Sequence, residues 1–179
     1  LPLLVHAEVI DPEVDVFDRE AVFIERMLAP LTSRLPELRL VLEHVSTAEG
    51  VDFVRAAAAN VGATITAHHL LLNRNAMFTQ GIHPHHYCLP VLKREQHRRK
   101  LLEAATDTDT GKFFLGTDSA PHPRTDKLSE CGCAGIYTSH AALELYTEVF
   151  SAAGALQQLH KFASVNGAQF YRWPLTKTQ

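Results

Sequence analysis

The chain has 179 residues, a net charge of −3, 46% hydrophobic residues and 21% charged residues, which is typical of one soluble globular domain or a large part of one. Its longest apolar runs are far too short to cross a membrane, and the slight negative charge provides no basic field for a nucleic acid. We therefore expect neither a membrane nor a nucleic acid as a partner.

Four short apolar runs predict four strands. They are mostly continuous rather than alternating, which is typical of strands covered on both faces, and they span Leu3–Val5, Leu38–Leu42, Ala63–Thr66 and Lys112–Leu115. The first run begins at once, whereas domains normally start with looser and more polar residues. We therefore expect that this chain continues a longer polypeptide.

Helical patterns lie between and after these runs. Apolar residues recur at helical spacing over Phe17–Leu35 (with Asp18 as its cap), Thr47–Asn60, Leu92–Ala105, His140–Phe150 and Leu156–Ala163, and Asn166-Gly167 is expected to stop the last helix. Strands that alternate with helices in this way indicate a parallel sheet with right-handed crossovers. Four such units form either half of an eight-stranded barrel or a small doubly wound sheet.

Each apolar run leads into side chains that can bind a metal. His6 follows the first run, His44 the second, His68-His69 the third and Asp118 the fourth. Because parallel α/β folds place their sites at the carboxyl ends of strands, we expect His6, His44 and Asp118 to converge. Imidazole and carboxylate groups are suitable zinc ligands, so the pattern favours a metal site.

Two further features have a simpler structural interpretation. His68 and His69 are adjacent, so on a strand only one of them can face the site. Cys131-Gly132-Cys133 has the wrong spacing for a zinc knuckle and predicts a tight loop. Together with Cys88 these are the only cysteines, and since three cannot all pair, they favour a reduced, cytoplasmic setting.

Seven short blocks carry a resemblance that covers nearly the whole chain. They are Leu4–Val9, Leu42–His44, Asn73–Asn75, Tyr87–Pro90, Gly116–His122, Cys131–Gly135 and Ser164–Gly167. In order and spacing these blocks resemble the dihydroorotases of the single-function bacterial type, within the amidohydrolase superfamily. The Gly-Thr-Asp-Ser-Ala-Pro-His block followed by Cys-Gly-Cys-Ala-Gly is the most specific part.

The resemblance implies an α/β fold, a distorted (β/α)8 TIM-type barrel whose last four strands are those predicted above. Residues 1–179 would then be the C-terminal portion of one metal-dependent hydrolase barrel domain, with its N-terminal half absent. The family holds two zinc ions with a His-x-His pair, a carboxylated lysine, two later histidines and an aspartate. His6 and His44 match the later histidines, and Asp118 matches the aspartate, which is also the catalytic proton carrier. For the substrate, the matches are His122 and the main chain of Leu89 and Ala134.

One departure from the family pattern is large. The chain has no His-x-His on an early strand and no lysine at a strand end, and His83-Pro84-His85 is expected in a loop. The missing N-terminal half of the barrel is therefore an expected partner, and a homodimer stays open. By itself this fragment is expected to be inactive.

The resemblance implies zinc-dependent, reversible hydrolysis of L-dihydroorotate to N-carbamoyl-L-aspartate in pyrimidine biosynthesis. Two alternatives remain. Another cyclic amidohydrolase, such as a hydantoinase or an allantoinase, would not need the carboxylate pocket of His122 and Ala134. A non-catalytic barrel partner would not need the ligand residues.

Overall fold

A parallel sheet of four strands forms the centre of the computed structural model, which describes residues 1–107 and 110–175. The strands are β1 (Leu3–Val5), β2 (Leu40–Leu42), β3 (Val61–Ile65) and β4 (Phe113–Leu115). Val5 pairs with Leu42, and Ile65 pairs with Leu115, so the carboxyl ends of all four strands lie at one edge. The four predicted strands are confirmed: β1 has the predicted bounds, and the other three have ends shifted by one or two residues.

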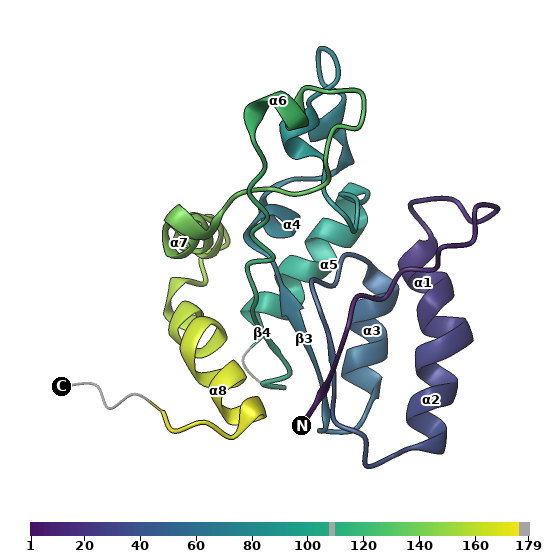
Figure 1. Cartoon of the computed structure of the whole chain (residues 1–179). Helices are drawn as coiled ribbons and strands as arrows, with labels where there is room; N and C mark the ends of the chain where they lie inside the picture. The colour runs from purple at the N-terminus through teal and green to yellow at the C-terminus, as the bar shows by residue number, and fades with distance from the viewer. Residues whose placement is uncertain (108–109, 176–179) are drawn as a thin grey trace.

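The helices follow the predicted alternation, with extra turns after β3 and β4. They are α1 (Arg19–Phe23), η1 (Ile24–Leu28), α2 (Ala29–Arg34), α3 (Ala48–Ala56), α4 (Ala67–Leu71), η2 (Arg74–Met77), η3 (Pro84–His86), α5 (Glu95–Thr106), α6 (Arg124–Lys127), η4 (Ser139–Ala141), α7 (Ala142–Ala152), η5 (Leu156–Gln158), η6 (Lys161–Val165) and α8 (Asn166–Tyr171). The first three form one helical stretch with a π-helical turn at its centre (Figure 1).

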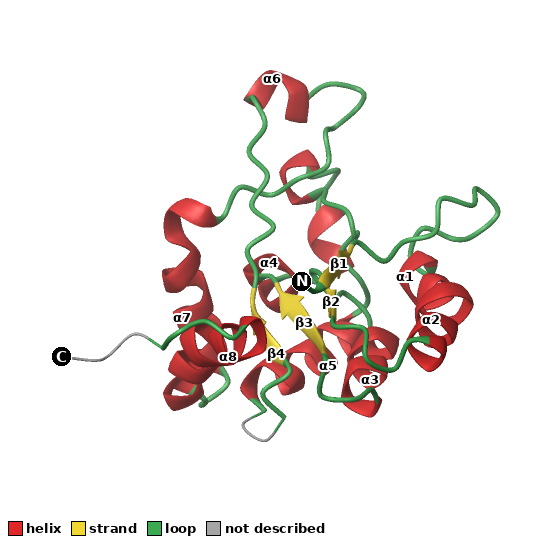
Figure 2. Ribbon diagram, turned by 60° about the horizontal axis from the view of Figure 1, so that its bottom comes forward, coloured by secondary structure: helices red, strands yellow, loops and turns green. Residues whose placement is uncertain are grey.

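Strand order decides between the two architectures that the sequence allowed. The strands lie in the order β1-β2-β3-β4, the same as their order along the chain. A doubly wound sheet would reverse direction at a switch point, whereas a barrel adds each strand beside the previous one. Figure 2 shows α2, α3, α5, α7 and α8 in an arc around the strands. The fold is therefore half of a TIM-type barrel.

Three local expectations need correction. Asp18 stands at the N-cap position of α1, but its side chain makes no capping bond. Asn166-Gly167 does not stop the helix, because α8 begins at Asn166, whose buried side-chain amide donates to the carbonyl of Phe113 (2.9 Å). His68 and His69 lie in α4 rather than on a strand, so strand alternation does not apply and both are buried. The threonine before each of two helices does cap it: Thr47 accepts from Gly50 N, and Thr66 accepts from His69 N.

The core lies between the sheet and the helices that cover it. Its largest buried side chains include Leu40, Leu42, Ile65, Phe113 and Tyr146. The Tyr146 hydroxyl donates to the Ile65 carbonyl (2.7 Å), which ties α7 to the end of β3. In contrast, Leu3 and Leu4 of β1 are 43% and 54% exposed. Within the described residues β1 and β4 each have a strand neighbour on one side only, and no helix there is long and apolar enough to span a membrane.

Candidate metal and substrate site

His6 and His44 are in direct contact at the carboxyl edge of the sheet. His6 follows β1 and His44 follows β2, and the parallel pairing of these strands brings the two side chains together. The Nδ1 atom of His6 lies 3.2 Å from the Nε2 atom of His44, and the ring centroids are 4.9 Å apart. The expectation that these two side chains converge is met.

A strained backbone holds His44 in this position. Its φ is 39°, in the left-handed region that residues with a Cβ seldom adopt, and Asp118 is similar at 40°. The His44 amide donates to the Thr64 hydroxyl (2.6 Å), which in turn donates to the Glu43 carboxylate (2.6 Å). These bonds fix the turn between β2 and α3, so the protein keeps the imidazole aimed at His6.

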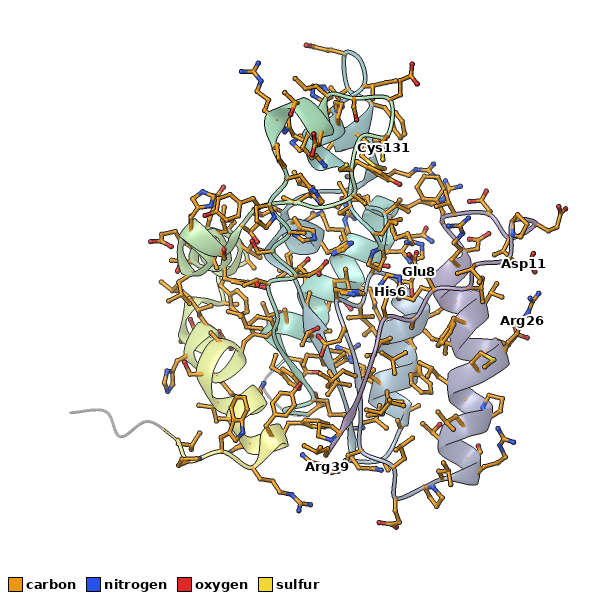
Figure 3. All side chains as sticks on the ribbon, in the orientation of Figure 1. His6, Glu8, Asp11, Arg26, Arg39 and Cys131 are labelled. Atoms are coloured by element: carbon orange, nitrogen blue, oxygen red, sulfur yellow. The ribbon has the colours of Figure 1, made fainter. Side chains whose placement is uncertain are left out.

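The Glu8 carboxylate orients the His6 ring. The side chains of His6 and Glu8 lie near each other (Figure 3), and Glu8 Oε2 is 3.3 Å from Nε2 of His6. The Glu8 side chain is buried, and Lys93 Nζ lies 4.0 Å from its Oε1. The hydrogen bond to Glu8 raises the pKa of His6. When Nε2–H donates to Glu8, Nδ1 of a neutral ring carries its lone pair towards His44. This is the usual arrangement of a metal-ligating histidine and its supporting carboxylate.

Glu20 fixes the loop that follows His44. This fully buried carboxylate accepts hydrogen bonds from both the backbone amide and the hydroxyl of Ser46 and of Thr47. Sequence reasoning missed Glu20, and it also missed Lys93. The sequence did contain a signal, namely a charged residue on the apolar face of the helix. Glu20 lies three residues before Phe23 and four before Ile24, so it shares their face.

The Asp118 carboxylate adds a smaller contribution, after that of Glu8, to the raised pKa of His6. It follows β4, three residues after Leu115, and partial desolvation raises its own pKa. A parallel bridge between Ser119 and Ile136 then brings the Cys131–Ile136 segment alongside. Asp118 is therefore followed directly by the segment that pairs with Cys131–Ile136, where part of a second group of predicted residues lies.

This second group consists of Leu89, His122 and Ala134. His122 is exposed, and its Nε2–H donates to the Ala134 carbonyl (3.0 Å). The Gly135 amide donates to the Tyr87 carbonyl (2.9 Å), which joins this segment to the one that carries Leu89. Gly132, with φ 67°, makes the tight loop predicted for Cys131–Cys133. The second group therefore lies on two loops that contact each other.

Comparison with known proteins shows what the chain is similar to. No family model matches the chain. It is 63% identical over 174 residues to a dihydroorotase of Nitrosomonas europaea and 65% identical over 171 residues to one of Azoarcus sp.. These matches cover 97% and 96% of the chain.

The chain belongs to the dihydroorotase family.

Solved dihydroorotase structures agree with this assignment. The enzyme of Saccharomyces cerevisiae in complex with 5-fluoroorotic acid gives a TM-score of 0.87 at 32% identity, over 97% of the chain. The Campylobacter jejuni enzyme gives 0.87 at 31% identity, over 99%. The chain spans about half the length of these dihydroorotases, with 50% of the Nitrosomonas europaea protein and 50% of the yeast chain covered. An L-hydantoinase of Arthrobacter aurescens, at 21% identity and a TM-score of 0.70, shares the fold alone.

The histidine pair fits the zinc that this family implies. Two nitrogen ligands at about 2.05 Å from a tetrahedral zinc would lie about 3.3 Å apart, and the observed separation is 3.2 Å. Burial lowers the pKa of His44 to about 4, so this ring is neutral near pH 7, as a metal ligand must be. The distance between the two rings and the neutral state of His44 therefore agree with a metal centre at this pair.

A second cluster, His68, His69 and Cys88, fits a metal less well. Their potential ligand atoms lie within 4.8 Å of one another, and all three residues are buried. However, both ring nitrogens of His69 already have partners, in Thr66 Oγ1 (2.8 Å) and the Pro90 carbonyl (3.0 Å). Burial raises the pKa of the Cys88 thiol to about 12, so it stays protonated. This cluster could hold an ion only by giving up these bonds and that proton.

Proposed function

We propose that this chain, completed by the rest of its barrel, catalyses the zinc-dependent, reversible hydrolysis of L-dihydroorotate to N-carbamoyl-L-aspartate in pyrimidine biosynthesis. The observation that carries the proposal is the His6–His44 pair, spaced as zinc ligands, in a chain 60–66% identical to dihydroorotases. The chain's own residues can bind a metal, move a proton and hold a carboxylate.

In this proposal residues 1–179 are the C-terminal portion of one barrel domain. The unpaired outer edges of β1 and β4 would continue into further strands, because an open parallel sheet leaves backbone groups without partners. His44 Nδ1 and both ring nitrogens of His68 are also buried without a hydrogen-bond partner among the described residues. Such groups are costly unless another segment or water satisfies them. The N-terminal half of the barrel would supply the strands and the remaining ligands.

His6 and His44 would hold one zinc, and Asp118 would bind a second. When bound, the zinc ions would lower the pKa of a water molecule and polarise the carbonyl that is attacked. Burial keeps His44 neutral for this task, and Glu8 keeps the His6 ring oriented. Glu20 would support His44 indirectly, because it binds the amides of Ser46 and Thr47 in the loop that follows His44.

Asp118 would move the proton. It follows β4 at the carboxyl edge of the sheet, where its carboxylate would accept a proton from the attacking water and pass it to the ring nitrogen that leaves. Its left-handed backbone, at φ 40°, is the kind of local strain that folded proteins maintain at functional positions. The reverse reaction would use the same residue in the opposite protonation state.

The substrate carboxylate would lie between His122 and the Ala134 amide, with the Leu89 main chain against the ring. Support comes from the yeast dihydroorotase, whose structure contains 5-fluoroorotic acid, a pyrimidine that carries a carboxylate. A hydantoinase-like substrate would leave the Ala134 amide without its anionic partner, so the carboxylate pocket favours dihydroorotate. The retained ligand residues argue equally against a non-catalytic barrel partner.

The setting and assembly are also part of the proposal. All three cysteines are free, which agrees with a cytoplasmic enzyme. A homodimer is open to a direct test by sedimentation of the complete protein.

The deciding experiment uses the complete polypeptide that contains this chain. We expect bound zinc by elemental analysis and hydrolysis of L-dihydroorotate, with much weaker hydrolysis of hydantoin and allantoin. A zinc-loaded protein that prefers either of the uncharged rings would replace the proposal by the corresponding alternative. A protein that binds no zinc and turns over none of the three would support a non-catalytic role.

A further inference from the structure

Lys127 directs its ammonium group at main-chain carbonyls on the two substrate loops. It is the last residue of α6 and is 4% exposed. Its Nζ donates to the carbonyls of Tyr87 (3.0 Å), Cys133 (2.6 Å) and Gly135 (3.0 Å). An ammonium group has three donors, so these carbonyls use all of them. The family pattern assigned no role to this lysine.

The Cys133 carbonyl matters because it shares a peptide group with the Ala134 amide. A trans peptide is planar, and its C=O and N–H point in opposite directions. When Lys127 holds the Cys133 carbonyl, it therefore fixes the direction in which the Ala134 N–H points. A cation on the carbonyl oxygen also polarises the peptide and strengthens the N–H as a donor.

The peptide on the other side of Ala134 is held as well. Its carbonyl accepts from His122 Nε2 (3.0 Å), and the following Gly135 carbonyl accepts from Lys127. Gly135 has φ 152°, and a Cβ at this position would lie 2.7 Å from Ala120. Both peptides that flank Ala134 are thus fixed, which leaves its N–H little freedom to turn.

Lys127 also joins the second loop to the first. The Tyr87 carbonyl accepts from both Lys127 and the Gly135 amide (2.9 Å), and the Lys127 Nζ lies 5.9 Å from the centroid of the Tyr87 ring. Leu89 is two residues further along this loop. One side chain therefore connects the two segments whose main chain faces the proposed substrate.

We propose that Lys127 is a positioning residue for the substrate carboxylate: through the Cys133 carbonyl it orients and polarises the Ala134 N–H, and so gives the site its preference for a ring that carries a carboxylate. This inference rests on the proposed function. It adds a residue that does not touch the substrate but decides how strongly the main chain binds an anion.

Lys112 provides a matched control in the same chain. Its Nζ also donates to three carbonyls, those of Val54, Arg55 and Ala57 at the end of α3. Burial lowers the pKa of both lysines. However, Lys112 precedes β4 and so lies at the opposite edge of the sheet from Asp118. A purely structural lysine of this kind should not affect recognition of a carboxylate.

The test compares Lys127→Met with Lys112→Met in the complete, zinc-loaded enzyme. The probes are 5-fluoroorotate and 5-fluorouracil, which differ only in the carboxylate, with affinities measured by calorimetry. For Lys127→Met we expect about tenfold weaker binding of 5-fluoroorotate, the cost of about one hydrogen bond, and an unchanged affinity for 5-fluorouracil. The KM for L-dihydroorotate should rise about tenfold while kcat changes much less. Lys112→Met should change none of these values.

Several outcomes would overturn the inference. Equal effects of the two variants, or equal weakening of both probes by Lys127→Met, would show that Lys127 has only a structural role.

Two fallbacks keep the test decisive. If 5-fluorouracil binds too weakly to measure, the comparison of Lys127→Met with Lys112→Met in 5-fluoroorotate affinity decides. If Lys127→Met does not fold, Lys127→Gln, which removes the charge but keeps two donor hydrogens, takes its place. A wild-type enzyme that neither binds 5-fluoroorotate nor hydrolyses L-dihydroorotate would instead defeat the proposed function.

Discussion

The Nδ1 atom of His6 and the Nε2 atom of His44 lie 3.2 Å apart, although 38 residues separate them in the chain. This separation matches two vertices of a tetrahedral zinc site. Three features set this separation. β1 and β2 pair in parallel, the Glu8 carboxylate holds the His6 ring, and the Thr64 hydroxyl accepts from the His44 amide. The proposed metal centre would therefore depend on residues that do not themselves bind the metal.

Replacement of Asp118 by alanine should abolish turnover in the complete enzyme while the fold is kept. The residue is proposed both as a metal ligand and as the proton carrier, and loss of a general acid–base group alone costs at least roughly 100-fold. The measurement is kcat for L-dihydroorotate, with circular dichroism as a check on folding. Asp52→Ala, which removes an exposed carboxylate that pairs with Lys100 on the helical layer, serves as the control. A mutant with most of its activity would refute the role of Asp118.

Replacement of His122 by alanine should mainly raise KM. Its proposed partner is the substrate carboxylate, which is remote from the carbonyl under attack, so substrate binding suffers more than the chemical step. Steady-state kinetics on L-dihydroorotate separates the two effects. A collapse of kcat with an unchanged KM would instead require a chemical role for His122.

Replacement of Glu20 by glutamine should weaken zinc binding and lower stability. The amide of glutamine would place a donor against the Ser46 and Thr47 donors, which leaves buried polar groups unpaired at a cost of about 1–3 kcal/mol. Loss of a residue that supports a metal ligand typically weakens metal affinity by roughly 10–100-fold. Competition with a chelator measures the zinc affinity, and urea unfolding measures the stability. Glu25→Gln, an exposed position on the same helical stretch, should change neither, and equal behaviour of the two variants would contradict the assignment.

Glu95 should contribute to stability in a pH-dependent way. Hydrogen bonds from Arg98 and Asn73 lower its pKa from an ordinary 4.5 to about 2 in the folded protein. A lowered folded-state pKa gives stability that is present above pH 4.5 and is lost as the pH falls towards 2. The wild type should therefore be more stable than Glu95→Gln at pH 7, by at most about 1 kcal/mol because the pair is partly exposed. This difference should shrink on acidification.

Urea unfolding of the two proteins at a series of pH values would measure this difference. Glu103→Gln provides the comparison, because this exposed carboxylate lies 4.0 Å from its lysine partner. A Glu95→Gln difference that stays constant down to pH 2 would show that the hydrogen-bonded carboxylate is not its source.

Residues 1–179 by themselves should have no dihydroorotase activity. His6 and His44 offer only two protein ligands to one zinc, and Asp118 offers one to the other, whereas catalytic zinc normally needs about three. The open edges of β1 and β4 should also cause aggregation or self-association. The isolated chain is assayed with zinc, and then again after addition of the separately expressed first half. Robust turnover by a monomer of this chain alone would overturn both the half-barrel proposal and the two-zinc mechanism.

The sequence by itself determined the alternation of strands and helices and the residues at the strand ends. Continuous apolar runs predict strands, and a histidine or aspartate shortly after such a run marks the carboxyl edge of a parallel sheet. These are local patterns, so they could be read without coordinates. The Gly116–His122 and Cys131–Gly135 blocks were specific enough to indicate the family, which the comparisons then confirmed.

Tertiary structure alone decided how the site is held. Glu20 is 26 residues from Ser46, and Lys127 is 40 residues from Tyr87, so no periodic pattern connects them. The helix that continues through Asn166-Gly167 was predicted wrongly for the same reason, because a hydrogen bond to Phe113 in β4 outweighs weak local propensity there. Buried polar groups must find partners wherever the fold provides them, and those partners are set by packing between distant segments rather than by the residues next to them in sequence.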